Sequence, residues 1–85
     1  MPDRDDNTSS AIRELRRDLQ VSQAELASRT GLAKNSIYRY EAGTNTPDAE
    51  ALIALWTIAV ENGSPTALYF SRLLAGLFPL LRSVF

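Results

Sequence analysis

Between residues 34 and 39 the chain carries a run of polar side chains that can donate and accept hydrogen bonds. The side-chain amide of Asn35 has a paired donor and acceptor, Lys34 and Arg39 carry positively charged donors, and Tyr38 joins an apolar ring to a hydroxyl group. These side chains form either a binding surface or the solvated face of an ordinary helix.

The same stretch contains the signals that begin and end two short helices. Ser22 is followed three residues later by Glu25, a capping box that predicts a helix starting directly after the serine. Gly31 stands where that helix needs a left-handed residue at its end, a conformation that glycine adopts without strain. A second helix is predicted over residues 34–41, and Gly43 ends it in the same way.

Each of these helices has one predicted inward face. The inward side chains are Ala24, Leu26, Ala27, Ile37 and Tyr40. The first face is narrow because a second helix must lie close against it. Ser36 belongs with the polar residues on the outward face of the second helix, so that face remains available to solvent or to a ligand.

A set of spaced residues extends this pattern in both directions along the chain. It consists of Ile12, Leu15, Arg16, Gln23, Leu26, Ala27, Gly31, Ser36, Ile37, Glu41, Gly43 and Pro47. Together these positions resemble the lambda-repressor/Cro-like (XRE) helix-turn-helix family over roughly residues 10–70, which is more specific than one short motif. The resemblance implies an all-α fold, a compact five-helix DNA-binding domain with the helix-turn-helix at its second and third helices. Members of this family usually act as dimeric transcriptional repressors.

On that resemblance, the second helix of the motif is the recognition helix, which lies in the major groove of DNA. Its implied DNA-contacting residues are Lys34, Asn35, Ser36, Tyr38 and Arg39. In that role the amide of Asn35 matches adenine, Lys34 and Arg39 match guanine or a phosphate, and Tyr38 can contact a thymine methyl group or a phosphate. Gln23, at the start of the preceding helix, is implied to clamp a backbone phosphate, and Thr44 and Asn45 to hold the next one. Relatives frequently carry Lys or Arg in that loop, so its neutral groups predict a weaker electrostatic attraction.

The family pattern also pairs an arginine of the first helix with a glutamate at the end of the recognition helix, here Arg16 and Glu41. We expect a partly buried salt bridge that fixes the angle between the two helices, a structural role rather than a DNA contact. Ala33 departs from the pattern because relatives carry Ser or Thr as the helix cap there. Two further departures lie in the fourth helix, where Trp56 replaces a residue that is usually small and Ala59 replaces one that is usually Leu. This pattern predicts that the two positions exchange side-chain volume.

Length and composition limit the classes of protein that remain. Eighty-five residues are enough for one small domain, which dimerisation would help to stabilise. The chain has no Cys and no His, so we expect no disulfide, metal site or cofactor, and nothing resembles a catalytic nucleophile and base. The net charge is −1, yet six basic and three acidic side chains fall between residues 12 and 40, a net +3 around the motif. Because no catalytic pair is recognisable, we expect that the protein is not an enzyme. The acidic, polar start lacks the features of a signal peptide, so we expect a cytoplasmic location.

Three segments are predicted along the chain. Apart from Met1, residues 1–8 lack large apolar side chains and are expected to be a disordered lead, and residues 9–76 form the helix-turn-helix domain. Residues 77–85 form an apolar C-terminal tail. Within the domain the first helix should be capped by Ser9 or Ser10, and its apolar side chains recur at helical spacing.

Two pairs of a hydroxyl residue and a proline predict the starts of the last two helices. Thr46 with Pro47 should open the fourth helix, and Ser64 with Pro65 should open the fifth. We expect the fifth helix to end near Ala75.

The C-terminal part holds more large apolar residues than a small domain easily covers. The side chains assigned to a dimer contact are Leu73, Leu77, Phe78 and Leu81. Burial against the first and fourth helices is the alternative and must explain part of this surface. A membrane helix is disfavoured, because charged residues, a glycine and a proline interrupt a stretch of only about 18 residues.

Two functions from different classes remain. The first is a sequence-specific regulator of transcription, most simply a dimeric repressor that presents two recognition helices to a palindromic operator. The second is an antitoxin-like or other protein-interaction module that binds another protein through the hydrophobic C-terminus. The expected partners are therefore double-stranded DNA, a second copy of the chain and, on the second hypothesis, another protein, with no role for a membrane.

Overall fold

Five helices follow one another in the computed structural model, which describes the backbone of residues 5–77 and the side chains of residues 8–77. They are α1 (Asp5–Leu19), α2 (Gln23–Thr30), α3 (Lys34–Ala42), α4 (Ala49–Glu61) and α5 (Thr66–Leu77). No strand occurs within this range. The predicted all-α, five-helix fold is therefore confirmed, with the helix-turn-helix formed by α2 and α3.

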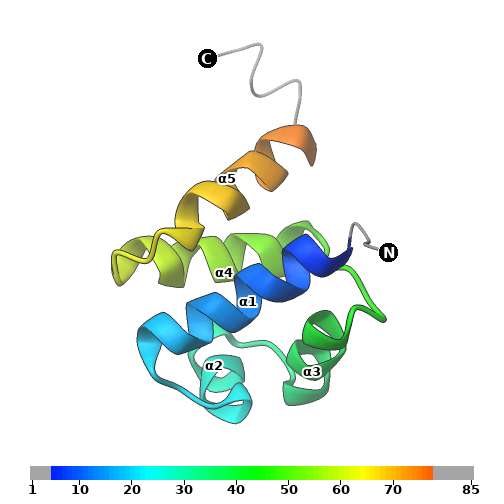
Figure 1. The fold of residues 1–85 in the computed structure, drawn as a ribbon, viewed down its shortest axis with the longest axis vertical. Helices are drawn as coiled ribbons and strands as arrows, with labels where there is room; N and C mark the ends of the chain where they lie inside the picture. Colours follow the sequence, from blue (N-terminus) through cyan, green and yellow to red (C-terminus); the bar gives the residue numbers. More distant parts are fainter. Residues whose placement is uncertain (1–4, 78–85) are drawn as a thin grey trace.

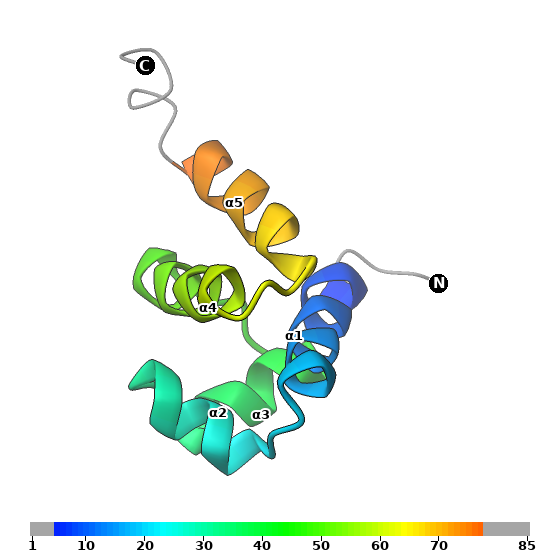
Figure 2. The same cartoon turned by 90° about the vertical axis from the view of Figure 1, so that its left-hand side faces the viewer.

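The helices are arranged in three levels, which Figures 1 and 2 show from two directions. α2 and α3 lie together at one end, α1 and α4 cross the middle, and α5 rises at the opposite end. α5 packs chiefly against α4, while α3 packs against both α1 and α2. The helix-turn-helix and α5 therefore expose separate surfaces on opposite sides of the middle level.

The core takes side chains from all five helices. Its largest fully buried side chains are Phe70, Ile12, Leu15, Leu26, Ile37 and Leu55. Removing this apolar surface from water is the main source of stability in a chain without disulfides. Ala24 is exposed, so its predicted place on the inward face is wrong, because α2 buries only the narrow stripe of Leu26 and Ala27.

Four of the helices end in the same backbone motif, in which the amide after a left-handed residue bonds to the carbonyl five residues earlier. After α1 the amide of Val21 donates to the carbonyl of Arg16 at 3.1 Å. After α3 the amide of Thr44 donates to the carbonyl of Arg39, also at 3.1 Å. The left-handed residue is a glycine at three of these ends: Gly31, Gly43 and Gly63. At the end of α1 it is Gln20, with φ at 58°.

α1 begins earlier than the sequence predicts. Its first residue is Asp5, so residues 5–8 are helical and do not belong to a disordered lead, while residues 1–4 lie outside the described range. Acidic residues favour the first turn of a helix, a signal that the apolar pattern alone does not carry. Ser9 does not cap the helix, because it is buried and its hydroxyl donates to the carbonyl of Tyr40 at 2.8 Å.

The start of α4 also differs from the prediction. The cap is Asp48, whose carboxylate accepts from the amide of Ala51 at 2.9 Å, and not Thr46. A carboxylate cap combines a hydrogen bond with a favourable charge at the positive end of the helix. α5 begins at Thr66, one residue later than predicted, and the hydroxyl of Ser64 accepts from the amide of Thr66 at 3.2 Å.

Trp56 lies at the surface of α4 rather than in the core. The residue is 36% exposed, and it forms a row with Ile53 and Val60, which are 46% and 49% exposed. Ala59 is fully buried, and Phe70 of α5 is buried in the same core cluster. The predicted exchange of volume between Trp56 and Ala59 is therefore wrong, because the large side chain is not in the core.

Candidate nucleic-acid interface

α2 begins at the predicted capping residue. The hydroxyl of Ser22 accepts from the amide of Glu25 at 3.1 Å, so one half of the capping box is present. The carboxylate of Glu25 accepts from Nη2 of Arg29 at 3.2 Å, one turn further along the same helix. Both side chains of this pair are exposed, so it adds little stability.

α3 turns one face to the core and the opposite face to solvent. Ile37 is fully buried, and Tyr40 packs half-buried against the same core. The predicted DNA-contacting residues with exposed side chains are Lys34, Asn35, Tyr38 and Arg39. Ser36 is half-buried at the edge of this face. The structure therefore brings four of the five predicted residues onto one open surface.

Tyr40, on the inward side of α3, lies in an environment that changes its pKa. Burial raises the pKa of Tyr40 above its ordinary value of 10.0, and the negative charge of Asp48 raises this pKa further. The nearby hydroxyl of Ser36 acts in the opposite direction on this pKa. At neutral pH Tyr40 is an uncharged phenol, as packing against an apolar core requires.

The C-terminal turn of α3 is held by side chains of α1. The hydroxyl of Ser9 donates to the carbonyl of Tyr40 at 2.8 Å, and Nη1 of Arg13 donates to the carbonyl of Glu41 at 2.7 Å. The last carbonyls of a helix have no partners within the helix. These two bonds therefore satisfy the end of α3 and fix it relative to α1. Sequence pattern does not reveal them, because nothing local marks a side chain that bonds about 30 residues away.

The carboxylate of Glu41 joins three helices. Nε of Arg16 donates to Oε2 at 2.7 Å and Nη2 donates to Oε1 at 3.1 Å, so the implied salt bridge is present with two hydrogen bonds. Nε2 of Gln23 donates to Oε1 at 3.1 Å. The Glu41 side chain is only 7% exposed and that of Arg16 is 27% exposed. The hydrogen bond with Glu41 raises the pKa of Arg16, although burial acts in the opposite direction.

This network changes the expectation for Gln23. The resemblance implies that its side chain clamps a phosphate, but one of its amide N–H groups is used by Glu41. A glutamine amide has two N–H groups, so one remains for a phosphate at the start of α2. Gln23 therefore also connects α2 to α3, a role that the motif does not reveal.

The loop after α3 lies next to the open face of that helix. Thr44 and Asn45 are both exposed, as a phosphate contact requires. The hydroxyl of Thr44 donates to the carbonyl of Arg39 at 3.3 Å, and the backbone amide of Asn45 points to the same carbonyl at 3.4 Å. The side-chain amide of Asn45 is therefore the more available donor of the two.

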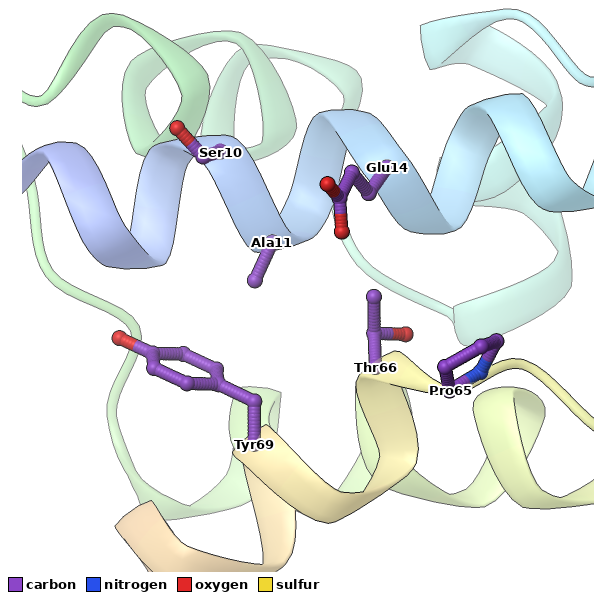
Figure 3. A pocket seen from close by; sticks show the side chains of 6 residues that line it. All are labelled: Ser10, Ala11, Glu14, Pro65, Thr66 and Tyr69. Carbon is purple, nitrogen blue, oxygen red and sulfur yellow. The ribbon is translucent and has the colours of Figure 1, made fainter.

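α1 separates its charges by face. The basic face is formed by Arg13, Arg16 and Arg17. Glu14 and Asp18 lie roughly a third of a turn away around the helix. The carboxylate of Asp18 accepts from the hydroxyl of Ser64 at 2.7 Å, and Glu14 lines a shallow hollow of about 400 Å³ between α1 and α5. Figure 3 shows Glu14 beside this hollow, with Thr66 and Tyr69 of α5 across from α1.

The residues assigned to a dimer contact have different surroundings. Leu73 is half-buried and packs against the core, whereas Leu77 is 51% exposed at the end of α5. Phe78 and Leu81 lie outside the described residues. Leu68 is a further exposed apolar residue of α5, at 60%.

The fold and the open face of α3 define a helix-turn-helix DNA-binding domain. A helix-turn-helix family model matches residues 12–55, just over half of the chain, from α1 into α4. The chain therefore belongs to this family, of the lambda-repressor/Cro-like (XRE) type, whose members bind DNA and regulate transcription. No curated protein and no solved structure matches it. Within residues 5–77, no helix is long and apolar enough to cross a membrane.

Proposed function

We propose that this protein is a sequence-specific regulator of transcription that acts as a dimeric repressor, with α3 in the major groove of a palindromic operator. The observation that carries this proposal is the open polar face of α3 on a helix whose position is fixed. Ile37 anchors the helix in the core, and Arg13 and Glu41 connect its end to α1. Base recognition requires side chains held in a defined orientation, and this anchoring supports it.

The chemistry of the open face supports a division of roles. Asn35 has the donor and acceptor that pair with adenine in the major groove. Lys34 and Arg39 carry donors for guanine or for phosphate, and Tyr38, with 60% of its surface exposed, can contact a thymine methyl group or a phosphate. Ser36 contributes from the edge of this face.

Beside α3, further contacts to the DNA backbone fall on neutral groups. The free N–H of Gln23 and the amides at the start of α2 suit one phosphate, and the exposed side chains of Thr44 and Asn45 suit the next. Because these groups carry no charge, each contributes little to the salt-dependent part of DNA affinity. A single domain should therefore bind weakly, which favours a dimer.

We place the dimer contact on α5 and the tail, at Leu73, Leu77, Phe78 and Leu81. The exposure of Leu77 supports this position, because Leu73 lies one turn before it on the same face of α5 and exposed apolar surface marks interfaces. A symmetric dimer would present two α3 helices to half-sites about 34–36 Å apart.

One observation favours the alternative of a protein-interaction module, although it lies on α4 and not at the C-terminus that the sequence indicates. Ile53, Trp56 and Val60 form an exposed apolar row on α4, outside the core and apart from α3. A second protein bound to such a row would make the chain an antitoxin-like adaptor in which DNA binding is secondary. Dimerisation through α5 would leave this row unused.

The proposal is tested by selecting bound sequences from a random DNA pool and measuring the effect of Asn35→Ala on the selected operator. The loss of a base contact should weaken operator binding by about 1–3 kcal/mol and relax the preference at one base pair of each half-site. Binding to random DNA should change little.

Asn62→Ala is the matched control, since it removes the same side-chain amide from the end of α4, where it donates to the carbonyl of Ile58. This variant should bind the operator like the parent at a temperature where both are folded. Selection that yields no common sequence, or equal operator affinity for the parent and Asn35→Ala, would contradict base recognition by α3.

A further inference from the structure

The C-terminal end of α1 carries a basic hollow that the contacts proposed above do not use. The hollow is lined by Arg13, Arg16, Arg17, Gln20 and Val21 and has a volume of about 510 Å³. Its lining contains three guanidinium groups and, among the described residues, no carboxylate. It is shallow and open rather than enclosed, so it suits a group presented by a larger surface.

The three guanidinium groups have unequal numbers of free donors, out of five N–H groups each. Arg16 donates three N–H groups, two to Glu41 and one to the carbonyl of Val21 at 3.3 Å. Arg13 donates one, to the carbonyl of Glu41. Arg17 is exposed and forms no ion pair with any carboxylate that the structure describes. The hollow therefore has an excess of hydrogen-bond donors.

The charge of the hollow is also uncompensated. Glu41 is engaged by Arg16, which leaves the positive charges of Arg13 and Arg17. The two acidic residues of the same part of α1 point elsewhere: Asp18 accepts from Ser64, and Glu14 lines the hollow beside α5 (Figure 3). An anion is the ligand that this arrangement attracts.

The hollow adjoins the helix-turn-helix. Val21 lies two residues before α2, and Arg13 and Arg16 both bond to Glu41 in the last turn of α3. A DNA backbone that passes the start of α2 therefore comes close to the hollow as well.

We propose that this hollow binds a phosphodiester group of the DNA backbone, next to the phosphate at the start of α2, with Arg17 and Arg13 as its principal donors. This inference rests on the proposed function and adds a charged contact that the neutral loop after α3 does not supply. The planar fork of an arginine matches two oxygens of one phosphate, which a lysine does not. The contact reads no base, so it raises affinity for all sequences equally.

Arg17→Gln tests the site with little structural cost, because Arg17 is exposed and makes no ion pair with the described residues. Operator DNA and random DNA should both bind more weakly by the same factor, and the ratio of the two affinities should stay constant. The slope of log affinity against log salt concentration should fall by about 0.9 in magnitude per domain.

Arg72→Gln is the matched control, since it removes the same charge from an exposed position on α5, away from the helix-turn-helix. It should leave the salt slope unchanged. An equal change of slope in both variants would overturn the site in favour of a general effect of net charge, and an unchanged slope in Arg17→Gln would overturn it directly. If the parent shows no sequence preference at all, the proposed function fails instead.

A second measurement separates the DNA backbone from a free phosphorylated molecule as the ligand. Inorganic pyrophosphate is titrated into the parent and followed by the amide NMR signals of residues 13–21, at constant ionic strength. We expect weak, non-saturating shifts, because an open hollow holds a free anion poorly. Saturation at micromolar pyrophosphate together with unchanged DNA binding in Arg17→Gln would overturn the assignment to DNA.

Discussion

At the scale of single residues, Glu41 connects the parts of the motif. Its carboxylate accepts from Arg16 and Gln23, and its backbone carbonyl accepts from Arg13, so one residue joins α1, α2 and α3. The side chain is nearly buried. The orientation of α3 therefore depends on contacts at its end as well as on its apolar face.

We expect Glu41→Ala to lower the free energy of unfolding by about 2–3 kcal/mol, because Arg16 loses its counter-charge and two acceptors. The value is below that for a deeply buried pair, since Arg16 is partly exposed and water can solvate it. Urea denaturation measures the change. Glu25→Ala, which breaks the exposed pair with Arg29, is the control and should cost no more than about 0.5 kcal/mol. Equal losses in both variants would refute this role of Glu41.

Residue roles were predictable where a local signal marks them. The outward position of Asn35 and Arg39 follows from helical periodicity, and the pairing of Arg16 with Glu41 follows from the resemblance to a family. Ser9 and Arg13 have no such signal, because their acceptors are backbone carbonyls of another helix. Side chains that bond to a distant backbone group leave no pattern in the sequence.

At the scale of elements, the end of α1 is the exception among four similar helix ends. Gln20 adopts the left-handed conformation that glycine adopts after the other three helices. Such a conformation costs a residue with a Cβ atom about 1–2 kcal/mol. Glycine would avoid that cost but would lose more entropy on folding.

We therefore expect Gln20→Gly to stabilise the protein by about 0.5–1 kcal/mol, measured as a rise in the midpoint of thermal or urea unfolding. The reciprocal control is Gly31→Gln. No atom lies within 4 Å of a Cβ added at Gly31, so this variant tests backbone strain alone and should destabilise by about 1–2 kcal/mol. A loss of stability in Gln20→Gly would show that the Gln20 side chain makes a compensating contact.

The sequence predicts α2 and α3 better than it predicts α4 and α5. Ser22, Gly31 and Gly43 mark the ends of the motif helices, and their signals act within a few residues. The burial of Phe70 and the exposure of Trp56 depend instead on how α5 crosses α4. Both α4 and α5 are apolar around much of their circumference, so periodicity does not determine which face is inward.

At the scale of the whole molecule, the helix-turn-helix and α5 occupy opposite ends (Figure 1). This arrangement allows a partner chain to bind α5 while α3 stays free. The proposed dimer depends on apolar side chains such as Leu77, which contributes nothing to the core while it is exposed.

We expect Leu77→Asp to shift the dimer toward monomer at least tenfold in dissociation constant, as loss of one well-buried anchor in an interface costs about 1–2 kcal/mol or more. Sedimentation equilibrium measures the shift. Val60→Asp, which places the same charge on the exposed row of α4, is the control and should leave the dimer intact. A monomeric parent would rule out the dimer, and a stronger effect at Val60 would move the interface to α4.

The separation of charges on α1 has a consequence for the rate at which the protein finds DNA. Arg13, Arg16 and Arg17 line the hollow next to the helix-turn-helix, while the carboxylate of Asp18 accepts from Ser64, just before α5. α1 therefore carries an uneven distribution of charge, although the net charge of the chain is only −1. We expect this distribution to turn the basic face of α1 toward a DNA duplex before contact, which raises the fraction of encounters that have a productive orientation. The net charge alone predicts weak repulsion between the protein and DNA instead.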